Sequence, residues 1–280
     1  MKRLAIALAI VAGARGLAAA HGPDAIFDPL TMDRHTPVST LDLDFAYVAY
    51  DEPANTDVTA VGITIGGQYV TPKGIGGYLS VPLSYVGLQV DLPAPLGVDD
   101  SELALGNIEL GGLYAKYLAS HAAIVVHGGI ALPTAGDEGV AANQILASSP
   151  RYGDLVQRAT NSTWLRLGLS PMGRSGKLFW RADVGLDLAL DEDNAATISP
   201  VFRVSVGGGI DLRTAHLLAE LVTVVVDDGS DDESASTFAI GARFVSGKLR
   251  PGVALIVPIG FDGALFDVDF AIAFSLAARL

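Results

Sequence analysis

Apolar and polar side chains alternate along most of this chain with a period of two residues. In KLFWRADVGLDLAL, residues 177–190, Trp180 and Val184 fall on one face, whereas Arg181 and Asp183 fall on the other. Successive side chains of an extended strand point to opposite faces of a sheet. The pattern therefore predicts strands with one apolar face and one polar face.

Twelve segments carry this pattern, after an irregular, Pro-containing stretch from His21 to Ser39. Their approximate spans are 40–50, 59–71, 77–91, 103–117, 122–134, 162–171, 177–190, 198–213, 216–226, 236–245, 250–260 and 266–280. Dyad alternation over segments of about 10 residues is typical of transmembrane β-barrels. The bilayer core offers no hydrogen bonds to a free strand edge, so such a sheet must close. We therefore predict an all-β fold, a transmembrane antiparallel up-and-down β-barrel of about 12 strands over residues 40–280.

The connections between these segments fall into two classes. The even-numbered ones are short, hold no acid and contain Lys or Arg in four of five cases: TPKGIG, LASH, PMGRSGK, RTAH and VSGKLRP. The odd-numbered ones are longer and acidic, and they include DEPANTDV, LPAPLGVDDSE, residues 135–161, DEDNAATIS and DDGSDDESA. Barrels of this kind alternate short periplasmic turns with longer outer loops. We therefore expect both termini in the periplasm. The strands of a soluble β-sandwich or propeller also alternate, but such a fold gives no reason for acidic connections at one end and basic connections at the other.

The last segment, FDVDFAIAFSLAARL, keeps its alternation to the final residue. In a closed sheet the last strand pairs with the first, so its residues are needed to the end. We expect this C-terminal strand to contact the barrel-assembly machinery of a Gram-negative cell. The outer surface is expected to contact outer-membrane lipid and lipopolysaccharide.

The N-terminal residues have the three parts of a secretory signal. A basic start at Lys2 and Arg3 precedes a short apolar stretch and the small residues Ala18 to Ala20, so we expect residues 1–20 to be removed on export to the outer membrane. Their removal takes three basic residues and no acid, which moves the net charge from -13 to -16. So acidic an exported chain is not expected to bind nucleic acid. The chain has no cysteine and thus no disulfide framework. The composition of residues 21–39 leaves open whether they fold inward as a plug.

The polar faces carry charges that antiparallel registers bring together. The expected cross-strand pairs are Arg166 with Asp183, Arg181 with Asp211, Asp187 with Arg203 and Glu220 with Arg243. Five further lumen carboxylates have no evident partner: Asp42, Asp44, Glu109, Asp267 and Asp269. Packing alone explains these ion pairs, because an unpaired charge that is buried in a narrow lumen is costly. Rings of carboxylates also select cations, which is the alternative for an open pore.

The search for catalytic or metal chemistry gives no site. His127 lies on the inward face of its strand, but no serine has a convincing cross-strand position and no Gly-x-Ser-x-Gly motif is present. GRSGK lacks the spacing of a phosphate-binding loop, and DDGSDDE does not match a calcium-binding loop. We interpret His127 as a polar filler of the lumen. The prediction is a protein that is not an enzyme, with no cofactor and no metal.

Three stretches resemble one known family. VPLSYV (81–86), LGNIELGGLYAKYL (105–118) and GGIALPTAGDEG (128–139) are similar to successive strands of the outer-membrane transporter-like family associated with the meta-pathway of phenol degradation. Asn107 stands where that family usually has an acid, Ala135 replaces a glycine, and Leu280 replaces the terminal aromatic residue common in outer-membrane barrels. The resemblance implies a passive channel or transporter for small, apolar or aromatic molecules. The alternative is a non-conducting structural or surface-interaction barrel with a salt-bridged lumen.

Overall fold

The structure is a computed structural model that describes residues 27–51, 56–90, 98–136, 151–191, 200–227, 232–259 and 267–280. The described residues form strands and one short 3-10 helix, η1, at Tyr152–Gln157. The strands are β1 Thr40–Asp51, β2 Thr56–Val70, β3 Ile75–Val90, β4 Val98–Leu105, β5 Glu109–Ala119, β6 Ala122–Ala131, β7 Trp164–Ser175, β8 Leu178–Ala189, β9 Val201–Asp211, β10 Ala215–Asp227, β11 Asp232–Phe244, β12 Leu249–Ile259 and β13 Asp267–Arg279. No helix in these ranges is long and apolar enough to cross a bilayer.

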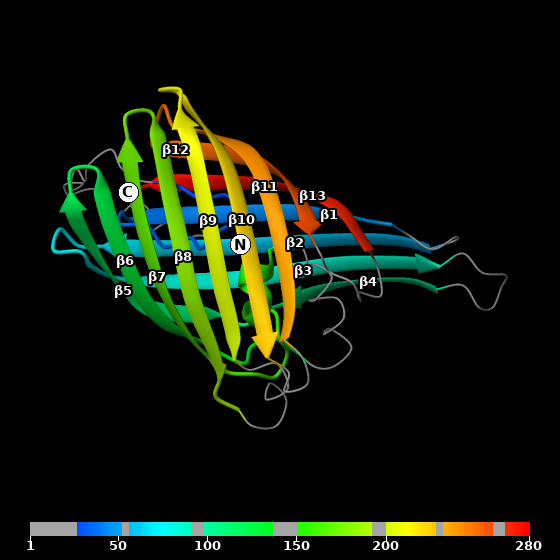
Figure 1. Ribbon diagram of the computed structural model, residues 1–280. Helices are drawn as coiled ribbons and strands as arrows, with labels where there is room; N and C mark the ends of the chain where they lie inside the picture. The colour runs from blue at the N-terminus through cyan, green and yellow to red at the C-terminus, as the bar shows by residue number, and fades with distance from the viewer. Residues whose placement is uncertain are drawn as a thin grey trace, which may run out of the picture.

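The strands pair in chain order into a closed antiparallel barrel (Figure 1). The barrel closes where β1 pairs with β13, from Thr40 opposite Arg279 to Asp51 opposite Asp267. The amide of Leu280 also donates to the carbonyl of Ser39 at 3.1 Å, so the C-terminal residues complete the sheet. This pairing explains why the apolar alternation continues to the end of the chain.

The barrel has twelve strand positions, as predicted, although the position predicted as one strand over 103–117 is divided. β3 pairs with β4 along Leu83–Val90 and with β5 along Ile75–Ser80, so the two short strands occupy one position. The interruption lies at residues 106–108. The fold class predicted from the alternation, a closed antiparallel 12-strand barrel, is confirmed.

The two faces of the sheet differ as the sequence pattern predicts. Along β9, Phe202, Val204 and Val206 are exposed, whereas Arg203 and Ser205 between them are buried. The exposed large side chains of the other strands are also mostly Leu, Ile, Val and aromatic residues. The apolar face of the barrel therefore points outward, where a bilayer would solvate it.

The connections separate into two ends of the barrel. Short hairpins join β2 to β3, β5 to β6, β7 to β8, β9 to β10 and β11 to β12, and β13 ends on the same side, at the upper left of Figure 1. The strand ends that the other connections join, such as the end of β6 and the start of β7, lie at the opposite end. We call these the short-turn end and the long-loop end.

Two segments without strand structure lie inside the barrel. Residues 27–39, the inner N-terminal segment, precede β1 and bury Phe27, Leu30 and Met32 against the inward faces of β9 to β12. Residues 151–163, the inner loop segment, contain η1, which contacts β10 and β11 and is visible within the barrel in Figure 1. The lumen is thus filled by backbone as well as by wall side chains.

Candidate functional site

The lumen contains one of the four ion pairs expected from the sequence. Arg203 Nε lies 2.8 Å from a carboxylate oxygen of Asp187, and its Nη2 lies 2.9 Å from the other oxygen. This bidentate geometry arises because Arg203 pairs with Gly185, one inward position along β8 from Asp187. A glycine opposite leaves space for the guanidinium, which a Cβ at Gly185 would meet at 2.6 Å.

Two other expected pairs are wrong because the strand registers differ from the ones assumed. Asp187, not Asp183, lies opposite Arg166 and accepts from its Nε at 3.3 Å. Arg181 lies opposite Gly207 rather than Asp211, and it donates to Asp183 on its own strand at 2.7 Å. Asp211 instead pairs with Arg174 of the neighbouring hairpin, at 2.5 Å.

The fourth expected pair, Glu220 with Arg243, is also wrong, because the inner N-terminal segment takes both side chains. Glu220 is 1% exposed and accepts hydrogen bonds from the amides of Leu30, Thr31 and Met32 and from the Thr31 hydroxyl, at 2.6–3.0 Å. Arg243 donates to the carbonyls of residues 28, 29 and 250 and to the hydroxyl of residue 275. The two side chains therefore fix the segment rather than each other.

A third anchor of this segment is Asp28. Its carboxylate binds Arg250 at 2.6 Å and Arg279 at 2.9 Å, at the short-turn end. Burial alone would raise the pKa of Asp28, but Arg279, Arg243 and Arg250 together hold that pKa below its usual value. Asp28 is therefore a carboxylate in the bound position.

The five carboxylates predicted to lack partners differ in position. Asp44 binds Arg34 at 2.6 Å and Arg151 at 3.3 Å, and Glu109 binds Arg166 at 2.5 Å. Asp42 accepts a hydrogen bond from the neighbouring Thr40 hydroxyl at 2.8 Å. Asp269 is exposed near the long-loop end of β13. Asp267 pairs with Asp51 by backbone, and its side chain lies outside the described part of the chain.

Arg34 joins the two inner segments to the wall. It binds Asp44 of β1 and, at 3.0 Å, Asp154 of η1; Arg151 binds the same two carboxylates. Two guanidiniums thus alternate with two carboxylates in a closed ring. Burial would raise the pKa of Asp154, but Arg34 and Arg151 hold it well below its usual range, so the ring is fully charged.

Asn107, in the interruption between β4 and β5, holds the inner loop segment. Its side-chain amide donates to the carbonyls of Val156, Ala159 and Ser162 at 2.6–3.3 Å, and its side-chain oxygen accepts from the Ala135 amide at 3.1 Å. The backbone amide of Asn107 donates to the Gln157 carbonyl. The side chain and the backbone amide of this fully buried residue thus all bind the connection between β6 and β7.

Little space remains between these contacts. A cavity of about 50 Å³ is lined by residues of both inner segments and of the wall, among them Asp33, His35, Gly67, Tyr78, Glu109 and Arg203. Such a volume holds only a few water molecules. Residues of both inner segments and of the wall therefore enclose a small polar cavity.

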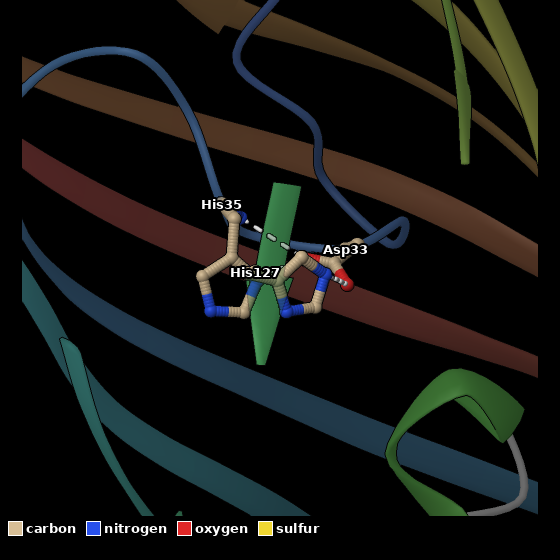
Figure 2. A group of neighbouring side chains, drawn as sticks. All are labelled: Asp33, His35 and His127. Atoms are coloured by element: carbon tan, nitrogen blue, oxygen red, sulfur yellow. Dashed lines mark hydrogen bonds and ion pairs between the residues drawn. The ribbon is translucent and has the colours of Figure 1, made fainter. Parts of the chain in front are cut away.

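Asp33, His35 and His127 meet beside this cavity (Figure 2). Asp33 and His35 come from the inner N-terminal segment, and His127 comes from β6. The two imidazoles stack with centroids 3.8 Å apart and 20° between their planes. Nδ1 of His35 contacts one Asp33 oxygen, and Nε2 of His127 lies 3.1 Å from the other.

Sequence reasoning missed this cluster and the anchoring role of Glu220. The sequence pattern indicates only a polar filler at His127, because its partners lie about 90 positions away along the chain, in a stretch without periodicity. The available signal was composition: residues 28–35, DPLTMDRH, combine two acids, an arginine and a histidine directly before the first strand. Charged residues in a segment that lies inside a polar lumen are expected to form ion pairs with charged residues of the barrel wall.

Known proteins resemble the chain in fold. It matches no protein family model and no curated protein sequence. Among solved structures, an outer-membrane channel from Pseudomonas putida F1 covers 92% of this chain and 98% of its own, with a TM-score of 0.63 at 12% sequence identity. The KdgM porin covers 85% and 99%, and LpxR from Salmonella typhimurium covers 86% and 100%, each with a TM-score of 0.47 at 10% identity. The first likeness shows that this chain has the barrel fold of an outer-membrane channel.

Proposed function

We propose that this chain is an outer-membrane channel for small molecules, closed in the described state by its inner N-terminal segment. The observation that carries the proposal is how this segment is held. Glu220 and Arg243 of the wall bind the segment through hydrogen bonds, and its own Asp28 forms an ion pair with Arg279. The segment adds no strand to the sheet. Such contacts exchange with water, so the segment can leave without breaking the barrel.

Several further expectations from the sequence belong to this proposal. Residues 1–20 direct export, and both barrel termini face the periplasm. The long-loop end faces the outer surface of the membrane, where lipopolysaccharide is found. The C-terminal strand contacts the barrel-assembly machinery. The resemblance to the family associated with phenol degradation suggests small, apolar or aromatic solutes, and we propose transport rather than catalysis as the role.

The test compares single-channel currents in planar bilayers. The mature chain is expected to be silent or to open only briefly. A variant in which residues 27–38 are replaced by a Gly-Ser linker of equal length should give stable, discrete steps. A matched control replaces the same number of residues in the long-loop stretch 137–148, which precedes the inner loop segment.

Silence from a folded linker variant would support the second candidate, a non-conducting barrel. The charged ring of Arg34, Asp44, Arg151 and Asp154 favours that candidate, because it links the inner loop segment to the wall.

The solute class is tested by the rate at which liposomes that contain the linker variant swell in different solutes. Faster entry of small aromatic compounds than of sugars of similar mass supports the proposed substrate class, and the reverse order contradicts it.

A further inference from the structure

We propose that Asp33, His35 and His127 form a binding site for a divalent transition metal ion, such as Zn²⁺, that ties the inner N-terminal segment to the barrel wall. Two imidazole nitrogens and a carboxylate oxygen are ligands that suit zinc. One candidate ligand atom from each residue lies within 4.8 Å of the other two. Figure 2 shows the two imidazoles beside Asp33, with one ring nitrogen of His127 at the Asp33 carboxylate.

One pair of candidate ligand atoms already has the spacing of a coordination shell. Zinc binds nitrogen and oxygen ligands at about 2.0–2.2 Å, so two ligands in a tetrahedral shell lie roughly 3.3 Å apart. Nε2 of His127 and the Asp33 oxygen are 3.1 Å apart. The two stacked imidazoles must turn apart for both in-plane lone pairs to reach one ion, with a fourth position left for water.

The second observation is that His127 lacks hydrogen bonds. Its side chain is 2% exposed, and neither ring nitrogen has a hydrogen-bond partner among the described residues, although Nε2 is near Asp33. A buried polar group without a partner is costly. A metal ion bound at Nε2 would satisfy this nitrogen and explain why a histidine is placed here.

Two nearby arginines do not exclude a cation. Nη1 of Arg203 lies 3.4 Å and Nη2 of Arg181 3.9 Å from Asp33, but Asp187 and Asp183 pair with these guanidiniums. The linked network consists of four carboxylates and three guanidiniums, and its members are Asp33, Asp183, Asp187, Glu109, Arg166, Arg181 and Arg203. The guanidiniums therefore do not outnumber the carboxyl groups around the candidate site.

The position of His35 is also supported from outside the cluster. The edge of the Tyr78 ring packs on His35, with centroids 4.1 Å apart, and the Tyr78 hydroxyl donates to Glu109 at 2.8 Å. A ligand held by packing loses little freedom when it binds a metal. Because Asp33 and His35 belong to the inner N-terminal segment and His127 to β6, the ion would fasten that segment.

The experiment titrates CoCl₂ and ZnCl₂ into the folded mature chain without an affinity tag. Every protein carries His21→Ala, since a histidine at the expected mature N-terminus could bind metal itself. We expect one equivalent of Co²⁺ with the visible absorption of a nitrogen- and oxygen-ligated ion, displaced by Zn²⁺. His127→Asn or His35→Asn should weaken binding by about 100-fold or more, because each removes a direct ligand.

The matched control is His121→Asn, at an exposed histidine in the hairpin between β5 and β6. It should leave the affinity unchanged. Equal affinity in the wild type and in folded His127→Asn protein would overturn the proposal, as would no binding by folded wild type at micromolar metal. Amide hydrogen exchange gives a second measurement: Zn²⁺ should slow exchange at residues 33–35 in the wild type and not in His127→Asn. Neither measurement requires that the barrel conduct.

Discussion

Glu220 shows at the scale of one residue how the lumen holds its inner N-terminal segment. A carboxylate has only acceptor atoms, and here both oxygens face donors from Leu30, Thr31 and Met32. Backbone donors in an irregular segment have no strand partner, so a buried segment must find acceptors elsewhere. One charged side chain on β10 supplies them for three consecutive residues.

Replacing Glu220 by Gln should loosen this segment without changing the barrel. The amide keeps one acceptor oxygen but turns an NH₂ group toward backbone donors, and loss of a charge-assisted hydrogen bond costs about 2 kcal/mol. Amide exchange at residues 30–32 should therefore accelerate by roughly 30-fold. Glu102→Gln, at an exposed position of β4, is the control. Unchanged exchange at residues 30–32 in the Glu220 variant would contradict the anchoring role.

At the scale of elements, the interruption between β4 and β5 is explained by what Asn107 does. A continuous strand would leave its side chain on a regular inward position, whereas the break directs its backbone and amide at the inner loop segment. A carboxylate at this position would accept hydrogen bonds but could not donate to the carbonyls of Val156, Ala159 and Ser162. The amide therefore fits the way this loop is held.

Asn107→Asp should accordingly release the inner loop segment. The substitution keeps the side-chain shape, but it brings a buried charge against three carbonyls, at a cost on the order of 3 kcal/mol. We expect faster proteolysis between residues 151 and 163 in an otherwise folded barrel. Gln89→Glu is an amide-to-acid exchange at an exposed side chain of β3 and should behave as wild type. A loop as resistant as that of the wild type would show that other contacts hold it.

The barrel elements could be predicted from the sequence and the lumen contacts largely could not. Alternation identifies which face of β9 is buried, because period two is a local property. It does not fix the register, and a shift by an even number of residues keeps the faces while changing every partner. Arg166, for example, lies opposite Asp187 instead of Asp183, four residues away. Glu220 and Arg243 were assigned to each other because the sequence gives no sign that an irregular segment enters between them.

Acid should weaken the attachment of the inner N-terminal segment through Asp28. Its pKa is lowered in the bound position, so protonation favours release: the attachment is complete above the ordinary pKa of about 4 and is lost as pH falls through the lowered value. Charged groups facing Asp28 are Arg243, Arg250 and Arg279, with His216 nearby.

The measurement is amide exchange at residues 28–32, corrected for intrinsic rates, in wild type and Asp28→Asn. The variant should exchange faster, and the difference between the two proteins should stay constant from pH 8 to about 4 and shrink below it. Both proteins carry His216→Asn, because this nearby histidine interacts with Asp28 and its titration would otherwise affect the difference. A difference that already declines between pH 7 and 5 would show that the pKa of Asp28 is not lowered.

At the scale of the whole molecule, the two ends of the barrel differ in charge. The strand ends next to the long connections carry acids, namely Asp51, Asp57, Asp99, Asp100, Asp227, Asp232, Glu233, Asp267 and Asp269. The short-turn end carries bases, namely Lys73, Arg174, Lys177, Arg213, Lys248, Arg250 and Arg279. Asp211, at that end, is paired with Arg174. The fixed charge of the barrel thus changes from negative at the long-loop end to positive at the short-turn end, whichever solute passes.

A barrel opened by the Gly-Ser linker should therefore conduct asymmetrically. Cations concentrate at the acidic end and anions at the basic end, so current is larger when the long-loop side is positive and each ion enters from the end that attracts it. At 0.1 M salt the Debye length is about 10 Å, comparable with the width of a small pore, but at 1 M it is about 3 Å. The asymmetry should therefore be clear at 0.1 M and weak at 1 M. Equal currents at both polarities in 0.1 M salt, from oriented channels, would show that the charges at the two ends do not act on the conducted ions.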